Sequence, residues 1–306
     1  MEKETLISII IPIHDFINYI EETVDSILKQ TLNELEILII DDGSKSETKS
    51  YLKQISSKDR RIKVYFLTEN RGAGVARNFG VSIAKGKYLF FIDGDDLLYN
   101  ENVLLSLYHM AEEHKVNIAG GSLISIDKDG NEIESKSLVF KKTGLHDYRN
   151  IQFDGGFYRF LYQKKFIDNH HIRFPEIKRF EDPVFLVDAF IKSPIFYATS
   201  KFVYKYRRNH KRTIWNKENI EDHLIGVKII LSRANKYELL ELQYLMAKNY
   251  LECLNYRFTN IAFLEKIKYT AYFLLKLKWQ NIYKLNKTQK VKITILKLIF
   301  STLKQI

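Results

Sequence analysis

The first hundred residues alternate continuous apolar runs with segments of helical periodicity, and this alternation constrains the fold more than any other feature. The apolar runs are rich in β-branched residues, as strands buried on both faces are, and lie at residues 6–13, 35–40, 62–67 and 88–92. Apolar residues at helical spacing separate them, most clearly over residues 73–84. Strands that alternate with helices form right-handed crossovers and a mostly parallel sheet. The sequence therefore predicts an α/β fold.

The pattern changes after about residue 115. Residues 116–126 and 133–140 are typical of strands, and Asp129-Gly130-Asn131 between them favours a hairpin. Beyond Lys217 the periodicity is helical to the end of the chain. We therefore expect one domain over residues 1–215, followed by a helical, basic region over residues 216–306.

The net charge is concentrated near the C-terminal end. The chain has 48 basic and 37 acidic residues, a net of +11, and residues 261–306 hold ten lysines and one glutamate, a net of +9. These lysines alternate with aliphatic and aromatic residues, a pattern typical of basic helices that lie on anionic membranes. The alternative is a helical subdomain that packs its apolar side on the rest of the protein. This segment is rich in aliphatic residues, and the chain shows no nucleic-acid recognition module, so nucleic-acid binding is not expected.

Cysteine content and hydropathy indicate the cellular setting. Cys253 is the single cysteine, so no internal disulfide can form and a reducing compartment is favoured. No uninterrupted apolar stretch reaches the length of about 18 residues that a spanning helix needs. The first apolar run ends at Pro12 without the small-residue cleavage site of a secretory signal. We expect a cytoplasmic protein, located at the inner face of the cell membrane if residues 261–306 bind lipid.

Three aspartates follow the fourth apolar run. Asp93 and Asp95 are two residues apart, so that in an extended segment their side chains point the same way, and Asp96 follows directly. Carboxylates this close repel one another unless a positive charge lies between them. A hard divalent cation supplies such a charge, and Gly94 lets a ligand approach the backbone closely. The alternative is a solvated turn that caps the next helix.

A second acidic pair, Asp41 and Asp42, ends the second apolar run. Ligands of parallel sheets gather beyond the carboxyl ends of the strands, where a carboxylate can accept hydrogen bonds from a base or a ribose. A turn with a helix cap is the alternative. The predicted helix over residues 73–84 begins near Arg71 and Arg77, and cations at a helix N-terminus favour an anionic ligand. Arg77 also breaks the three-glycine dinucleotide fingerprint, because it stands where the third glycine belongs.

The second half contributes a further acidic pair and a basic segment. Glu181 and Asp182 precede Pro183, so Asp182 can cap a helix or serve as a general base toward a hydroxyl. Residues 204–212 hold five cations and a histidine in nine positions. Such a segment can neutralise a diphosphate leaving group, or it can be a basic strand exposed to solvent.

Taken in chain order, these segments resemble those of the family 2 glycosyltransferases, which have the GT-A fold. The matching segments are residues 8–12 (SIIIP), Gln30-Thr31, 36–44 (EILIIDDGS), 70–72 (NRG), 76–78 (ARN), 84–88 (AKGKY) and 93–96 (DGDD). The resemblance implies a Rossmann-like, mostly parallel sheet with helices on both faces. It also implies that residues 1–215 are a GT-A catalytic domain, with a nucleotide-sugar half near residues 1–115 and an acceptor half near residues 116–215.

The resemblance implies an inverting, metal-dependent transfer of one sugar. The donor would be a nucleotide-diphosphate sugar, a UDP-sugar, and the acceptor a hydroxyl of a glycan or lipid-linked glycan. Asp93 and Asp95 would form the DxD motif that holds Mn²⁺ or Mg²⁺, and Asp182, beside Glu181, would deprotonate the acceptor. The implied nucleotide-sugar contacts are Pro12, Asp41, Asp42, Arg71, Arg77, Asp93, Gly94, Arg207, Arg208 and His210.

The chain also departs from the family pattern. His14-Asp15 follows the first strand, where many family members have Tyr-Asn, and residues 212–215 (RTIW) share only the end of the Gln-x-x-Arg-Trp box of processive members. We therefore expect a non-processive enzyme of capsule or lipopolysaccharide assembly. Two alternatives stay open. One is a sugar nucleotidyltransferase, which would have a glycine- and lysine-containing loop after its first strand. The other is a non-catalytic, membrane-associated scaffold with the same fold.

Overall fold

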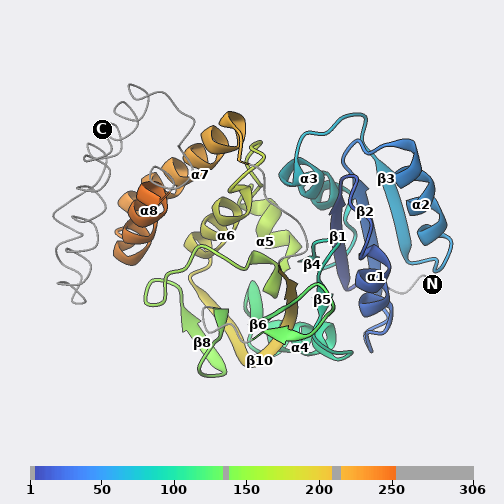
Figure 1. Cartoon of the computed structure of the whole chain (residues 1–306). Coiled ribbons are helices and arrows are strands. Elements are labelled where there is room, and N and C mark those ends of the chain that lie inside the picture. The colour runs from blue at the N-terminus through green and yellow to red at the C-terminus, as the bar shows by residue number, and fades with distance from the viewer. Residues whose placement is uncertain (1–3, 134–137, 209–214, 253–306) are drawn as a thin grey trace.

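The structure is a computed structural model, and it describes residues 4–133, 138–208 and 215–252 (Figure 1). Its strands are β1 (Ile7–Ile13), β2 (Leu35–Asp41), β3 (Ile62–Phe66), β4 (Tyr88–Phe91), β5 (Leu97–Leu98), β6 (Ile118–Ile126), β7 (Glu132–Ile133), β8 (Gly144–Asp147), β9 (Phe160–Gln163) and β10 (Ile195–Arg207). Its helices are α1 (Ile20–Leu28), α2 (Ser46–Ser56), α3 (Ala73–Ile83), α4 (Val103–Glu113), the 3₁₀ turn η2 (Phe157–Arg159), α5 (Lys164–Asn169), α6 (Glu181–Lys192), α7 (Lys217–Lys236) and α8 (Leu240–Glu252).

One large sheet runs through the described part of the protein, in the order β3-β2-β1-β4-β9-β6-β10-β5. The first four strands in this order are parallel, with Ile9 of β1 opposite Ile37 on one side and Phe90 on the other. Helices α1 and α2 cover one face of these strands and α3 covers the other (Figure 1). Both faces of β1, β2 and β4 are therefore buried, which is why these strands are continuous apolar runs, whereas the edge strand β3 is only partly buried. The predicted α/β architecture is confirmed.

Helix α3 lies unusually close to the sheet. A Cβ atom added at Gly80 would lie 2.6 Å from Ile10 Cγ2 of β1, closer than real side chains approach. The absence of a side chain at this position lets the helix descend onto β1. Because Arg77 is on the same helix, this close packing also fixes where its side chain leaves α3.

The second half of the sheet is mixed. Strand β9 lies antiparallel between β4 and β6, and β10 runs parallel to β6. The predicted hairpin at residues 129–131 is confirmed by the antiparallel pairing of β6 with β7. Residues 138–140, the last three of its predicted second strand, lie outside any strand. The short strands β5 and β9 were not predicted.

A cluster of aromatic rings joins the two halves. Phe91 of β4 packs edge-on against Phe174 and Phe185 and at a tilt against Phe157. The rings of Phe174 and Phe185 stack with their centroids 4.1 Å apart. Phe185 belongs to the second turn of α6, so this cluster holds the beginning of α6 against the end of β4. Large buried aromatic side chains contribute strongly to core stability and prefer such defined ring geometries.

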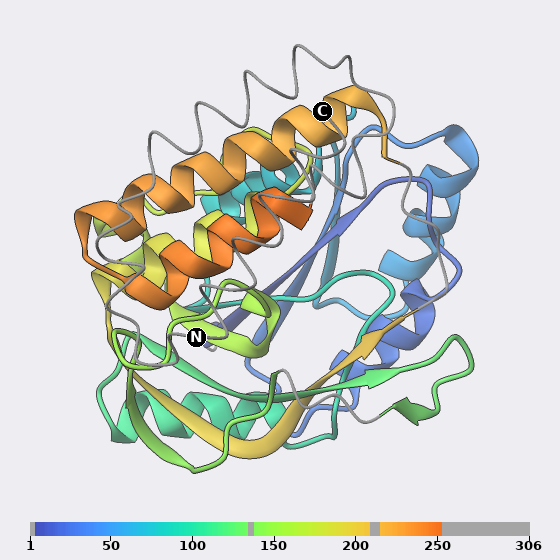
Figure 2. The same ribbon diagram turned by 60° about the vertical axis from the view of Figure 1, so that its left-hand side comes forward.

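Helices α7 and α8 follow β10, as the periodicity predicts. Helix α7 packs against α6 and against α8, and the two C-terminal helices lie side by side, orange in Figure 2. The division at residue 215 remains a prediction. Residues 209–214, which include His210, and the basic segment 261–306 lie outside the described residues. Among the helices that are described, none has the length and hydropathy needed to cross a membrane.

Candidate active site

A cleft with a volume of about 450 Å³ opens beyond the carboxyl ends of β1 and β4. It brings together residues that lie far apart in the sequence, because β1, β4, α3, α6 and β10 all end or begin beside it. The residues predicted from the sequence that line it are Pro12, Arg77, Asp93, Gly94, Asp95, Glu181, Asp182 and Arg207. Asp41, Asp42, Arg71 and Arg208 are not among its lining residues.

The turn after β4, which we call the aspartate turn, holds three carboxylates. Asp93, Asp95 and Asp96 each have an oxygen within 4.8 Å of the others. Asp96 is fully buried, and it accepts hydrogen bonds from the Tyr204 hydroxyl (2.7 Å) and the Arg207 backbone N–H (2.7 Å). Burial, and then the charges of Asp95 and Asp93, raise the pKa of Asp96 well above its ordinary value. A bound cation would offset this repulsion.

These residues fit a hard divalent cation. Asp93 and Asp95 line the cleft, whereas both carboxylate oxygens of Asp96 are taken by Tyr204 and Arg207. Carboxylate oxygens are the ligands that Mg²⁺ and Mn²⁺ prefer. Asp93 and Asp95 would therefore hold the ion, and Asp96 would anchor the turn that carries them. The sequence assigns only Asp93 and Asp95 to the metal and gives Asp96 no role. The contacts that anchor Asp96 come from Tyr204 and Arg207, more than 100 residues away in the sequence.

Arg77 connects the aspartate turn to the second acidic pair. Its Nη2 donates to Asp93 Oδ1 (2.8 Å) and its Nη1 donates to Glu181 Oε1 (2.9 Å). The guanidinium lies over the rings of Phe157 and Phe174, at 4.8 and 5.3 Å from their centroids. Burial opposes the charge, but Asp93 and Glu181 raise the pKa of Arg77 above its ordinary value. Arg77 is thus a buried, permanently charged link between Asp93 and Glu181.

Asp182 lies in the first turn of α6, so the structure excludes the helix cap, one of the two roles that the sequence left open for it. The N-cap is Phe180, and Glu181 and Asp182 are the first two residues of the helix. Phe180 has a φ of +69°, which is uncommon for a residue with a bulky side chain. The turn is held by α7, where Gly226 comes so close that a Cβ atom would lie 2.9 Å from Phe180 Cβ. Asp182 therefore faces the cleft from a strained and tightly packed turn.

The environment of Asp182 favours its neutral form. Burial, and then the neighbouring charge of Glu181, raise the pKa of Asp182 well above its ordinary value, while Arg77 acts in the opposite direction. A carboxylate with a raised pKa is a stronger base than an exposed aspartate, and perturbed carboxylates in clefts are typical of catalytic sites.

The acidic pair at the end of β2 organises a loop. The two carboxylate oxygens of Asp42 accept the backbone N–H groups of Arg71 (3.0 Å) and Gly72 (2.7 Å) at the start of α3. The Ser44 N–H donates to Asp41 Oδ2 (3.3 Å), and both aspartates are buried. Gly43 has a φ of +70°, and a Cβ atom there would lie 2.5 Å from the backbone of Glu69. Asp42 therefore links β2 to α3, and its contact with a nucleotide stays a prediction.

The arginines of the predicted basic segment differ in their surroundings. Arg207 lines the cleft, but its guanidinium is buried among acceptors of the protein. Arg208 lies beside the ring of Tyr206, 5.7 Å from its centroid. On the α3 side, Arg71 pairs at the surface with Glu176 (2.7 Å).

Other lining residues were missed by the sequence analysis. They are basic or aromatic and include Lys178, Arg179, Tyr158 and Tyr206. Lys178 pairs with Glu218 of α7 (3.0 Å), and the rings of Tyr158 and Tyr206 lie parallel, 5.5 Å apart. No spacing in the sequence relates these residues to the aspartates, because only the folded chain brings the end of β10 and the loop before α6 to the cleft beyond β4.

An α/β sheet with an aspartate turn and a second acidic pair in one cleft has the architecture of a GT-A glycosyltransferase. The family model described as glycosyl transferase family 2 matches residues 8–172, which is 165 of 306 residues. The chain therefore belongs to glycosyl transferase family 2. The matched range includes Asp93 and Asp95 and ends before Glu181.

Individual relatives agree with this assignment. An uncharacterized glycosyltransferase of Haemophilus influenzae is 33% identical over 202 residues, which cover 65% of this chain and 78% of the relative. Glycosyltransferase GlyG of Streptococcus pneumoniae is 27% identical over 217 residues, covering 66% of this chain and 71% of the relative. A match at 44% identity to an uncharacterized glycosyltransferase of Rickettsia conorii spans 133 residues, so the chain covers only 22% of that relative.

Solved structures support the fold. Residues 1–349 of Staphylococcus aureus TarS superimpose with a TM-score of 0.71 at 20% identity, covering 90% of this chain and 82% of that one. The complex of the same protein with UDP-GlcNAc gives a TM-score of 0.69. At this identity the likeness concerns the fold, and the GT-A prediction is confirmed.

Proposed function

We propose that this chain transfers one sugar, with inversion at the anomeric carbon, from a UDP-sugar to a hydroxyl of a glycan acceptor. The observation that carries the proposal is that Asp93, Asp95 and Asp182 line one cleft, although about ninety residues separate the first two from the third. An inverting transferase needs an anchor for the donor diphosphate and a base facing the acceptor. The cleft supplies candidates for both.

On the donor side, Asp93 and Asp95 would hold Mn²⁺ or Mg²⁺. The ion would neutralise charge on the diphosphate as it departs. The protein holds the carboxylates of Asp93 and Asp95 in one turn, and Arg77 adds a fixed positive charge beside Asp93. Such preorganised charges stabilise a transition state without rearrangement at the moment of reaction.

On the acceptor side, Asp182 would act as the general base. It takes the proton of the acceptor hydroxyl while the hydroxyl oxygen forms a bond to the anomeric carbon. The bond from that carbon to the diphosphate oxygen breaks, and its electron pair leaves with UDP. Glu181 is already paired with Arg77, which leaves Asp182 as the acid of this pair that is available for a proton. No covalent intermediate is required.

Two named relatives support the choice of substrates. TarS of S. aureus has been solved with UDP-GlcNAc. The poly(ribitol-phosphate) beta-glucosyltransferase of Bacillus spizizenii is 33% identical over 208 residues, covering 65% of this chain and 32% of the relative. We therefore propose a UDP-sugar donor and an acceptor within a surface polysaccharide, such as a capsule or a lipopolysaccharide glycan.

We also propose that the enzyme works at the inner face of the cell membrane. The support is the net charge of +9 in residues 261–306, since basic segments with aromatic residues bind anionic lipid. The full-length protein should sediment with vesicles that contain phosphatidylserine, and replacing the ten lysines of this segment by glutamine should release it. Equal sedimentation of both forms would exclude this anchor.

The donor side is tested by calorimetry with UDP, with and without Mn²⁺. UDP should bind in a Mn²⁺-dependent manner, and Asp95→Asn should abolish the dependence because an anionic ligand is lost. Asp25→Asn, which changes an exposed aspartate of α1, is the matched control. A chain that binds no UDP in either condition would be a scaffold and not a transferase. Unchanged Mn²⁺ dependence in Asp95→Asn would remove this residue from the metal site.

The acceptor side is tested with Asp182→Asn. This variant should bind UDP and Mn²⁺ like the unchanged protein but lose transfer, measured as donor turnover on a panel of UDP-sugars. Asp188→Asn on the same helix, where the carboxylate pairs with Arg233, is the matched control. If Asp182→Asn transfers at the rate of the unchanged protein, the base is another residue.

A further inference from the structure

Arg207 is the last residue of β10, and its side chain is buried although it carries a charge. Only 2% of the residue is exposed. Its Nε donates to the Asp95 carbonyl oxygen (2.9 Å), Nη1 to the Lys128 carbonyl oxygen (2.9 Å) and Nη2 to Glu22 Oε2 (2.8 Å). The guanidinium carbon also lies 4.1 Å from the centroid of the Tyr19 ring.

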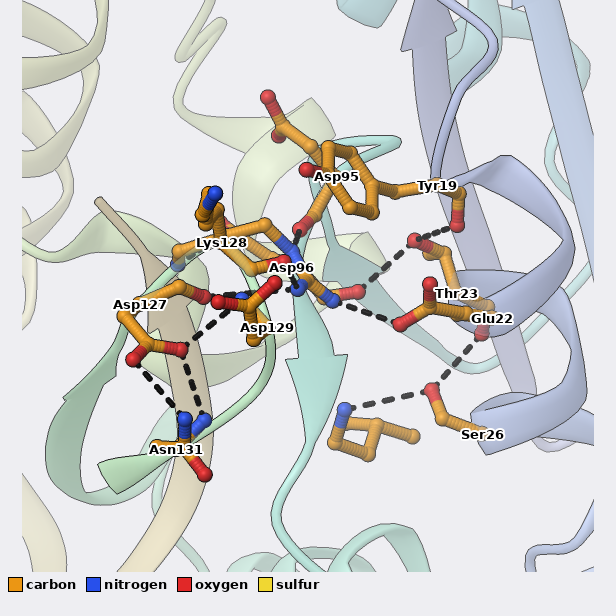
Figure 3. A network of polar contacts seen from close by, with 12 residues as sticks. Tyr19, Glu22, Thr23, Ser26, Asp95, Asp96, Asp127, Lys128, Asp129 and Asn131 are labelled. Carbon is orange, nitrogen blue, oxygen red and sulfur yellow. Dashed lines mark hydrogen bonds and ion pairs between the residues drawn. The ribbon is translucent and has the colours of Figure 1, made fainter. Parts of the chain in front are cut away.

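These contacts enclose the aspartate turn from two sides. Glu22 and Tyr19 belong to α1 and its start, whereas Lys128 belongs to the loop of the β6–β7 hairpin. Figure 3 shows Asp95 and Asp96 between these two elements. The side-chain hydroxyl of Thr23 donates to the Asp96 carbonyl oxygen (2.8 Å), so α1 holds the turn at a second point.

The backbone of Arg207 completes the arrangement. Its N–H donates to Asp96 Oδ1 (2.7 Å), so the same residue binds the Asp96 carboxylate through its main chain and the Asp95 carbonyl through its side chain. Asp96 Oδ2 is taken by the Tyr204 hydroxyl, three residues earlier on β10. The end of β10 thus binds the carbonyl of Asp95 and the carboxylate of Asp96, on either side of the Asp95 side chain that lines the cleft.

This geometry does not suit a residue that binds the leaving diphosphate. All three guanidinium nitrogens already donate to acceptors of the protein, and one of these acceptors is a carboxylate. To reach a phosphate, the side chain would have to leave a charged partner and two backbone carbonyls, and buried polar groups left without partners are costly.

We infer that Arg207 is a positioning residue, which fixes the Asp95–Asp96 turn in the conformation that binds the cation. The inference rests on the proposed function, since it assumes that Asp93 and Asp95 hold the metal. Groups that orient metal ligands act mainly on metal affinity, and their loss typically weakens metal binding by about 10- to 100-fold. Arg207 reaches this turn from a strand that lies about 110 residues further along the chain.

The test is the affinity for Mn²⁺ in the presence of UDP, measured by calorimetry on the full-length chain. Arg207→Lys keeps the positive charge but cannot reach three separate acceptors, so its affinity for Mn²⁺ should fall by about 10- to 100-fold. Its affinity for UDP at saturating Mn²⁺ should stay close to that of the unchanged protein. A residue that binds the diphosphate would show the reverse: little change in Mn²⁺ affinity and a loss of UDP affinity at saturating metal.

Glu22→Gln provides a second variant that does not depend on burying a new side chain, since Glu22 is 55% exposed. It should weaken Mn²⁺ binding in the same direction as Arg207→Lys but by less, and the double variant should be no weaker than Arg207→Lys alone. Glu21→Gln is the matched control, because Glu21 is the neighbouring acid on α1 and pairs with Lys58 instead. Normal Mn²⁺ affinity in both Arg207→Lys and Glu22→Gln overturns this inference and leaves the proposed function unaffected. Absence of Mn²⁺-dependent UDP binding in the unchanged protein overturns the proposed function, and the inference with it.

Discussion

Replacing Arg77 by methionine tests whether the ion pairs that Arg77 makes with Asp93 and Glu181 stabilise the folded protein. The side chain of Arg77 is 5% exposed, and its partners differ in depth: Glu181 is 9% exposed and Asp93 is 30% exposed. Methionine fills a similar space among Phe157 and Phe174 but carries no charge. The variant therefore leaves Glu181 as a buried carboxylate without its cation.

The expected loss of stability follows from this difference in burial. Removing one partner of a buried ion pair typically costs about 3–5 kcal/mol. The Asp93 arm is closer to solvent and should add no more than about 1 kcal/mol. For a domain of this size 1 kcal/mol corresponds to a shift of about 2–4 °C. The total of about 3–6 kcal/mol should therefore lower the midpoint of thermal unfolding by about 6–24 °C.

Thermal unfolding followed by circular dichroism, without added metal, measures this effect. The double variant Arg77→Met/Glu181→Gln should recover part of the loss, because it removes the buried charge that the single variant leaves unpaired. Arg173→Met, which breaks the more exposed pair with Asp168, is the control and should change stability by no more than about 1 kcal/mol. Added Mn²⁺ should raise the midpoint of Arg77→Met more than that of the unchanged protein, since it supplies a positive charge beside Asp93. If Arg77→Met unfolds within a few degrees of this control, the bridge is not structural.

Two further predictions concern Asp182. Gly226→Ala should lower kcat with little effect on UDP binding, because its Cβ would displace Phe180 beside the proposed base. Gly155→Ala is the control, since it has open space around it and should leave kcat unchanged. Equal kcat in both variants would refute the coupling between Gly226 and Asp182. Transfer should be lost as the pH falls through the raised pKa of Asp182, so the acid limb of kcat should lie above the ordinary aspartate value of about 4. In metal-free protein the raised pKa values of Asp182 and Asp96 act on stability with the opposite sign. The protonated folded form is favoured, so the free energy of unfolding should decrease as the pH rises from about 4 through these values, and melting in EDTA across this range measures it.

The strands that are buried on both faces were predicted within one or two residues. The run at residues 6–13 became β1 (Ile7–Ile13) and the run at residues 35–40 became β2 (Leu35–Asp41), because a strand covered by helices on both sides has to be apolar throughout. Strands β5 and β9 are two and four residues long, and neighbouring strands determine their burial. Strand β5 is too short to show a period, and β9, unlike the equally short β4, lies in a stretch where aromatic, apolar and charged residues are mixed.

Asp182 illustrates how a local rule can fail. An acid directly before proline is typical of a helix cap, yet the helix begins at Glu181, two residues before Pro183, and its cap is a left-handed Phe180. The φ of Phe180 is maintained by α7, about 45 residues away in the sequence, through the close approach of Gly226. Capping propensities describe isolated helix ends, and here tertiary packing overrides them.

The sequence by itself determined the α/β class, the helical C-terminal region and the candidate acids at the strand ends, because the periodicity of burial and the position of a strand's end are local properties of the chain. Only the tertiary structure decided what those acids contact. It paired Arg77 with both Asp93 and Glu181, and it placed Arg207 between Glu22 and the Asp95 carbonyl, across 185 and 112 residues of sequence. Such pairs form because the fold brings the start of α6 and the end of β10 to the turn after β4, although β9 and β6 lie between β4 and β10 in the sheet. This arrangement depends on the whole folded chain rather than on any segment of it.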